Sequence, residues 1–148
     1  MRTRGIRVHH KQGFALMECL FAILIFSVGI LTLVLLQTKA IYQSREAKYR
    51  MDASMLANQL IGEMWIADRG SAALDTRFGS TAAGSGYSAW QSTVAATLPG
   101  VATSPPTVTV ATSGSMAGST VTIQIFWKAP TEQSSAPAHR YVVTTQIL

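Results

Sequence analysis

Hydrophobic residues in this chain form one long run near the N-terminus, then one helical stripe, then several alternating segments. The run covers residues 14 to 36, "FALMECLFAILIFSVGILTLVLL", in which Glu18 is the only charged residue. A helix of about 20 apolar residues crosses a hydrocarbon core of roughly 30 Å, because each residue adds about 1.5 Å. The run therefore predicts a transmembrane helix over residues 14–36.

The next segment, residues 37–69, predicts that this helix continues in amphipathic form. It contains no proline and a single glycine, Gly62. Gly70 and Arg69 are suited to a helix C-terminus, so we expect one helix from Phe14 to about Arg69. Apolar residues recur there at spacings of 3, 4 or 7, which is typical of a helix with one buried face: Tyr42, Tyr49, Ala53, Leu56, Leu60, Met64 and Ala67.

The rest of the chain, residues 70–148, predicts a small α+β globular domain. Trp90, Val94 and Leu98 stand four apart and predict a short helix that ends at Pro99. Alternating residues predict strands within 106–112, 119–128 and 139–148, with loops at 70–88 and 128–139. We expect a small antiparallel sheet packed on the amphipathic half of the long helix.

Charge is concentrated at the N-terminus. The chain has 12 Lys and Arg against 7 Asp and Glu, and four of these basic residues lie within residues 1–13, which contain no acid. Residues 78–127 contain no charged residue at all. A nucleic-acid-binding domain needs a basic face on its folded part, so we expect no nucleic-acid partner. The basic residues belong to a leader segment.

Two common types of N-terminal segment fit this region incompletely. A secretory signal peptide, with a cleavage site at residues 38–40, should have an apolar core of only about 7–15 residues. An uncleaved anchor fits the length but leaves Glu18 unexplained, because a carboxylate within a membrane span is costly and usually has a specific role. At this position Glu18 can also be a residue at the membrane edge whose carboxylate reaches the headgroups.

A third interpretation accounts for the glycine as well as the carboxylate. A basic leader that ends in Gly13, followed by Phe14, Leu16, Glu18 and an unbroken apolar helix, resembles the type III signal of type IV pilins. The resemblance implies that a prepilin peptidase cuts between Gly13 and Phe14, removing residues 1–13. It also implies that Phe14 is then N-methylated and that the helix is retained.

The resemblance also implies a role for Glu18. Cleavage creates an α-ammonium group at Phe14, one helical turn from the Glu18 carboxylate, and a neighbouring subunit brings the same pair. Opposite charges attract strongly where the dielectric constant is low, and an unpaired buried charge is costly. We expect Glu18 to set the depth and register at which subunits assemble.

Residues typical of catalysis or metal binding are sparse. His9 and His10 lie in the leader, and His139 is expected to stand alone beside Arg140. There is no metal-ligand spacing and no phosphate-binding loop, and Cys19 suits apolar packing better than nucleophilic chemistry. The sequence predicts neither an enzyme nor a cofactor or metal site.

Within the pilin family, the chain most resembles PilV-type minor pilins over nearly its whole length, with specific matches in about the first 30 residues. It lacks the C-terminal cysteine pair and the mid-helix proline common in major pilins. The resemblance implies a bacterial inner-membrane protein with an external C-terminal domain, which later joins a pilus. Its partners would be the prepilin peptidase, other minor and major pilins, the assembly platform and membrane lipid. Two alternatives are a minor pseudopilin of type II secretion and a single-pass membrane protein whose external domain binds a ligand.

Overall fold

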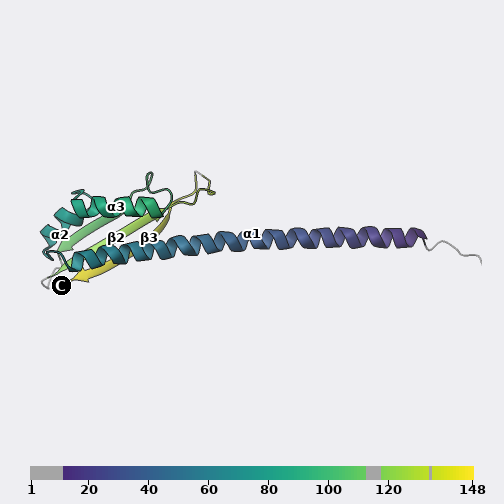
Figure 1. The fold of residues 1–148 in the computed structure, drawn as a ribbon, viewed down its shortest axis with the longest axis horizontal. Helices are drawn as coiled ribbons and strands as arrows, with labels where there is room; N and C mark the ends of the chain where they lie inside the picture. The colour runs from purple at the N-terminus through teal and green to yellow at the C-terminus, as the bar shows by residue number, and fades with distance from the viewer. Residues whose placement is uncertain (1–11, 113–117, 134) are drawn as a thin grey trace, which may run out of the picture. The chain divides into compact units, whose positions relative to one another are not determined.

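The computed structural model describes residues 12–112, 118–133 and 135–148. It divides into two units, Met1–Ser44 and Arg45–Leu148, and the second is called the compact unit below. In chain order the elements are α1 (Gln12–Trp65), α2 (Ser71–Phe78), α3 (Ser85–Thr97), β1 (Thr107–Thr112), β2 (Ser119–Trp127) and β3 (His139–Ile147) (Figure 1). Helix α1 contributes residues to both units.

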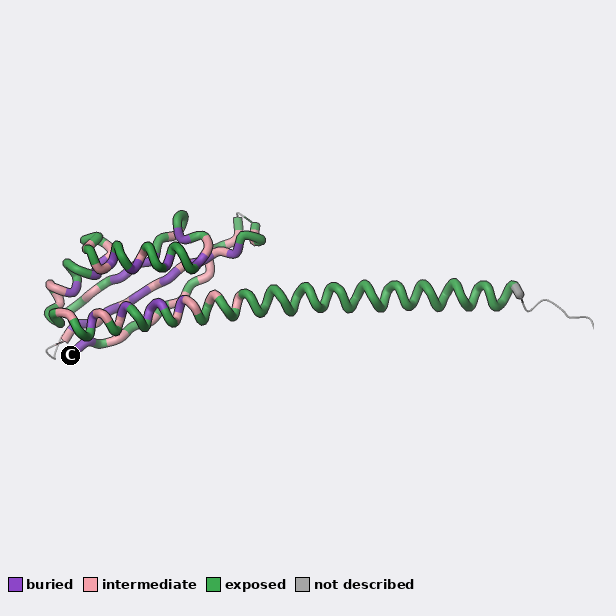
Figure 2. The backbone as a smooth tube through the Cα atoms, viewed as in Figure 1, coloured by how far each residue is buried: buried purple, intermediate pink, exposed green. Residues whose placement is uncertain are grey.

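The first unit, where the structure describes it, is the N-terminal part of α1. Residues 13–44 are all exposed (Figure 2). Three of their hydroxyl groups bond within the helix: Ser27, Thr32 and Thr38 each donate to the carbonyl oxygen four residues earlier, at 2.7, 2.9 and 3.0 Å. Among the described residues, the helix over residues 13–65 is long and apolar enough to cross a membrane. Hydrogen bonds between side-chain hydroxyl groups and carbonyl oxygens of the same helix suit a helix that has no water around it.

The compact unit contains the predicted three-stranded antiparallel sheet. Its strand order is β1-β2-β3, with β2 in the centre. Along the whole of β2 buried residues alternate with half-buried ones, because successive side chains point to opposite faces. Val121, Ile123 and Ile125 are completely buried on one face, while Thr122 and Gln124 lie on the other. The alternation seen in the sequence therefore identifies the core-facing side of the sheet.

Helices cover one face of this sheet and form the core with it (Figures 1 and 2). The last part of α1 supplies a row of buried side chains, as predicted for the stripe from Ala53 to Met64, whereas Tyr42 of the same predicted stripe is 44% exposed. Trp90 of α3 ties two helices together, since its indole Nε1 donates to the Leu56 carbonyl oxygen at 2.9 Å. The helical side chains of the core are Ala53, Leu56, Ala57, Leu60, Met64, Leu74, Phe78, Tyr87, Trp90 and Val94.

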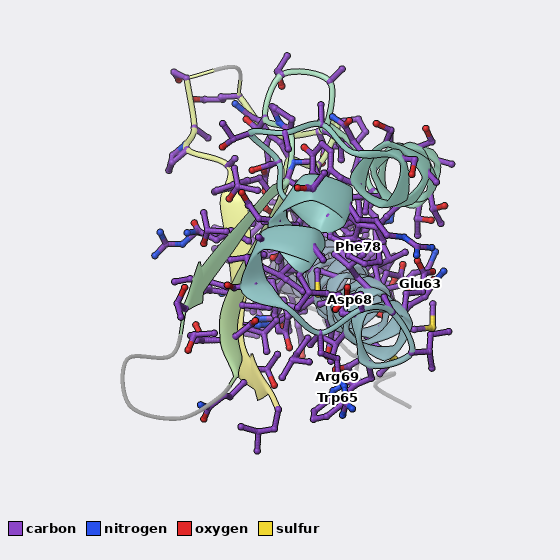
Figure 3. The ribbon with its side chains drawn as sticks, turned by 90° about the vertical axis from the view of Figure 1, so that its left-hand side faces the viewer. Glu63, Trp65, Asp68, Arg69 and Phe78 are labelled. Carbon is purple, nitrogen blue, oxygen red and sulfur yellow. The ribbon has the colours of Figure 1, made fainter. Side chains whose placement is uncertain are left out.

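Helix α1 ends at Trp65, four residues before the predicted end at Arg69 (Figure 3). The Ala67 N–H donates to the Met64 carbonyl oxygen at 3.3 Å, a tighter turn than in an α-helix, and the Asp68 carboxylate then accepts a hydrogen bond from the Gly70 N–H at 3.0 Å. Other parts of the unit then bind Arg69: its carbonyl oxygen accepts from the Ser119 hydroxyl at 3.1 Å, and its guanidinium donates to the Leu148 carbonyl at 2.8 Å. These contacts hold the connection to α2 in a non-helical conformation.

The prediction of a loop over residues 70–88 is wrong, because that segment contains α2 and the beginning of α3. Helix α2 buries only Leu74 and Phe78, which lie one turn apart. A side chain at Gly86 would collide with the Phe78 ring, so glycine allows α3 to begin directly against α2. Packing between the two helices stabilises a segment whose own sequence signal for a helix is weak.

Candidate functional site

The three residues singled out from the sequence, Gly13, Phe14 and Glu18, lie in the first turns of α1. A Cβ atom added at Gly13 would meet nothing within 4 Å. Glycine also disfavours a helix by about 1 kcal/mol relative to alanine. The fold of the described chain therefore gives no reason for a glycine at this position.

Glu18 lies on the same face of α1 as Phe14. A shallow groove on that face is lined by Phe14, Met17, Glu18, Phe21, Ala22 and Ile25. These residues follow the spacing of three and four that places side chains on one side of a helix. The carboxylate is the only charged group in this lining, and no ion pair joins it to another residue within the described ranges. Phe14 and Glu18 thus share one face, one helical turn apart, as the sequence predicts.

The apolar surface around Glu18 is extensive. Phe14 is 78% exposed and Ile25 is 69% exposed, and Cys19 is exposed as well. Apolar surface in water costs about 25 cal/mol for each Å². The first part of α1 is therefore compatible with an apolar environment such as a membrane.

A second set of exposed apolar side chains lies on α1 within the compact unit. Met51 and Met55 are 73% and 61% exposed, and Ile66, just after the helix, is 88% exposed. They lie away from the core, whose contacts come from Ala53, Leu56 and their neighbours on the opposite side. This part of α1 therefore has one face committed to the sheet and another that bears exposed methionines.

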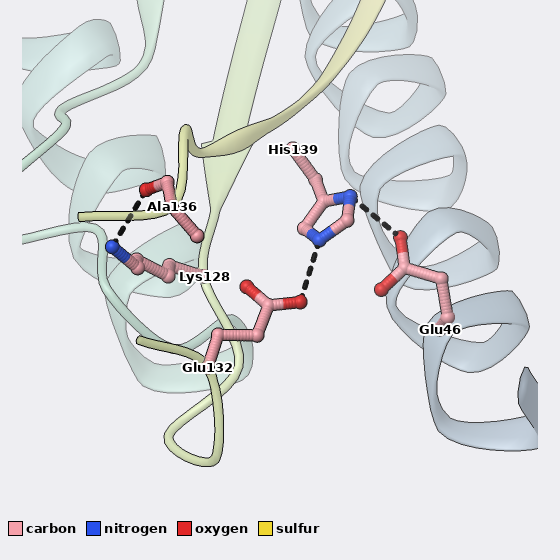
Figure 4. A network of polar contacts seen from close by, with 5 residues as sticks. All are labelled: Glu46, Lys128, Glu132, Ala136 and His139. Atoms are coloured by element: carbon pink, nitrogen blue, oxygen red, sulfur yellow. Dashed lines mark hydrogen bonds and ion pairs between the residues drawn. The ribbon is translucent and has the colours of Figure 1, made fainter. Parts of the chain in front are cut away.

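The structure also brings together a polar cluster that sequence reasoning missed, formed by Glu46, Glu132 and His139 (Figure 4). His139 Nε2 lies 2.7 Å from Glu132 Oε1, and His139 Nδ1 lies 3.1 Å from Glu46 Oε1. The prediction that His139 stands alone beside Arg140 is therefore wrong. Glu46 comes from α1, Glu132 from the segment after β2, and His139 is the first residue of β3.

The cluster is held by its surroundings. The His139 ring stacks on Trp127, with the ring centres 5.7 Å apart and the planes inclined by 17°. In the connecting segment, the Lys128 ammonium donates to the Ala136 carbonyl at 2.7 Å (Figure 4). Both ring nitrogens of His139 therefore face carboxylate oxygens while the ring itself is fixed against the sheet.

In comparisons with family models, with curated protein sequences and with solved structures, the chain has no significant match.

Proposed function

We propose that this chain is a minor pilin: a non-enzymatic subunit that helps to initiate or cap a type IV pilus by packing its helix among those of other pilins. It would be made as a prepilin in the bacterial inner membrane. Removal of residues 1–13 would leave Phe14 as an N-methylated first residue. Its partners would be the prepilin peptidase, the assembly platform, lipid, and other minor and major pilins.

One observation carries this proposal: Gly13, Phe14 and Glu18 stand at the start of a helix that is apolar and fully exposed at one end and buried in an α+β unit at the other. Gly13 has no packing role among the described residues, which favours recognition by another protein. A peptidase that must fit the chain into a narrow site would require a residue without a side chain. The shared face of Phe14 and Glu18 suits pairing between an amine and a carboxylate in neighbouring subunits.

Processing provides the first test. Mass spectrometry of the protein from cells that contain a prepilin peptidase should give a mature chain that begins at Phe14. Gly13→Leu should leave the full-length chain in the membrane, whereas Gly29→Leu, another helical glycine with open space around it, should still be cleaved. A mature N-terminus at Met1 or Ile41 would overturn the proposal.

Deletion of the gene separates the pilin and pseudopilin alternatives. For a minor pilin, the number of surface pili should fall while type II secretion continues. Loss of secretion with normal pili would instead identify a minor pseudopilin. If neither changed, the chain would be a different kind of single-pass protein, whose external domain binds a ligand.

A further inference from the structure

The chemistry of the Glu46, Glu132 and His139 cluster differs from that of an ordinary ion pair. Two carboxylates face a single imidazole, so the cluster is anionic whether or not the ring is protonated. Among the basic residues close to the cluster in sequence, Lys128 donates to the Ala136 carbonyl, and Arg140 is exposed next to His139 on β3. A cation placed among the three side chains would neutralise this negative charge.

The donor atoms match one class of cation. Zn²⁺ binds imidazole nitrogen and carboxylate oxygen at about 2.0–2.2 Å, and sites with three protein ligands keep a fourth position for water. In this cluster one donor atom from each residue lies within 4.8 Å of the others. Ligands in a tetrahedral zinc site are about 3.3 Å apart, so these atoms need to approach by at most about 1.5 Å. One ion binds only one ring nitrogen of His139, so the glutamate that faces the other nitrogen must rotate its carboxylate towards the ion.

The burial of the three side chains fits a bound ion as well. The Glu132 side chain is only 9% exposed, whereas Glu46 and His139 are 31% and 36% exposed. One side of the cluster is therefore covered and the other is open to water, which gives an ion a path in and leaves room for a water ligand. Stacking on Trp127 already fixes the plane of the imidazole, as metal sites require of their histidines.

We propose that Glu46, Glu132 and His139 form a binding site for a divalent transition-metal ion of the zinc type. The ion joins α1, the segment after β2 and the start of β3, and so fastens the connection between β2 and β3 to the helix. Imidazole is a poor ligand for Ca²⁺ and Mg²⁺, so these ions are not expected to replace it. The proposal concerns the compact unit alone and does not depend on the proposed function.

Calorimetric titration of the full chain with ZnCl₂, in detergent micelles after removal of metal by a chelator, tests the site. We expect one ion per chain, a higher melting temperature with zinc, and no such rise with CaCl₂. Glu46→Gln changes one exposed oxygen donor on a helix, and it should weaken binding on the order of 10–100-fold or more. Glu132→Gln and His139→Ala should do the same.

Two controls keep the result specific. Glu63→Gln removes another acid of α1, whose carboxylate accepts a hydrogen bond from Gln59 of the same helix, and it should leave zinc binding unchanged. His9→Ala/His10→Ala removes the leader histidines, and it should also retain one ion. If the folded wild-type chain takes up no zinc, or if none of the three variants weakens binding, the proposal is wrong. In the first case the cluster is only a histidine bridged by two carboxylates.

Discussion

The hydroxyl group of Tyr87 is a buried acid whose ionisation should limit the stability of the compact unit at high pH. It donates to the Pro106 carbonyl oxygen at 2.7 Å, and Tyr87 is only 6% exposed. Burial raises the pKa of Tyr87 above its ordinary value of 10.0. The folded chain therefore keeps this proton at pH values where the unfolded chain loses it.

The sign of the pH effect follows from proton linkage. Below about pH 10 tyrosine is protonated in both states, and the full contribution of Tyr87 to stability is present. Above this pH the unfolded chain binds fewer protons than the folded chain, so the free energy of unfolding falls. The slope due to Tyr87 reaches at most about 1.4 kcal/mol per pH unit, until the pH passes the pKa of the folded state.

Tyr87→Phe should reduce stability near neutral pH and remove this part of the alkaline loss. Without the hydroxyl, the buried Pro106 carbonyl loses its donor, which costs about 1–3 kcal/mol. The gap between wild type and variant should therefore be largest near pH 8 and shrink towards pH 11. Urea unfolding of the full chain in detergent, followed by near-ultraviolet circular dichroism at several pH values, measures both curves.

Tyr49→Phe is the matched control, because it removes a tyrosine hydroxyl from the partly buried edge of the same core. A gap between wild type and Tyr87→Phe that stays constant from about pH 8 to about pH 11 would show that folding does not hold the Tyr87 proton.

Two further predictions concern assembly and packing. Glu18→Ala should still insert into the membrane and be cleaved after Gly13, but it should fail to co-purify with partner pilins. Glu18→Gln should be nearly as defective, because an amide cannot neutralise an ammonium group. Normal surface filaments in both variants would show that Glu18 only lies at the membrane edge. Trp90→Ala should lower the free energy of unfolding by about 3–5 kcal/mol, because it leaves a cavity and removes the hydrogen bond to the Leu56 carbonyl. Trp65→Ala, at a position that is 43% exposed, should lower it much less. Equal losses in urea unfolding would show that Trp90 is not a core residue of this kind.

Periodic patterns made the long helix and the three strands predictable. Repeated spacing over many residues fixes the element type, as with the alternation from Val121 to Trp127 and the stripe through Leu56, Leu60 and Met64. Helix α2 was missed because its eight residues bury only two side chains, and its N-cap, Gly70, has no side chain to accept a capping hydrogen bond. It packs against both α3 and β1, and the local sequence does not reveal these contacts.

The two candidate sites also differ in whether the sequence predicts them. The residues around Glu18 are neighbours in sequence, so a helical repeat alone places Phe14 and Glu18 on one face. Glu46 is far in sequence from Glu132 and His139, and only the docking of the sheet on α1 brings the three together. A histidine at the start of a strand, preceded by a segment with one glutamate, gives no spacing that would indicate this contact.

The strand order has a consequence for how the compact unit folds. Each strand pairs with its neighbour along the chain, so both hairpins form by closing short loops. The covering of the sheet by α1 instead joins distant segments, as in the hydrogen bond between the hydroxyl groups of Ser54 on α1 and Tyr141 on β3. Contacts between near neighbours form faster than distant ones, so the strands should pair early and dock on the helix late. Until docking is complete, the apolar face of the sheet is exposed, and the buried face of α1 covers it only in the last step.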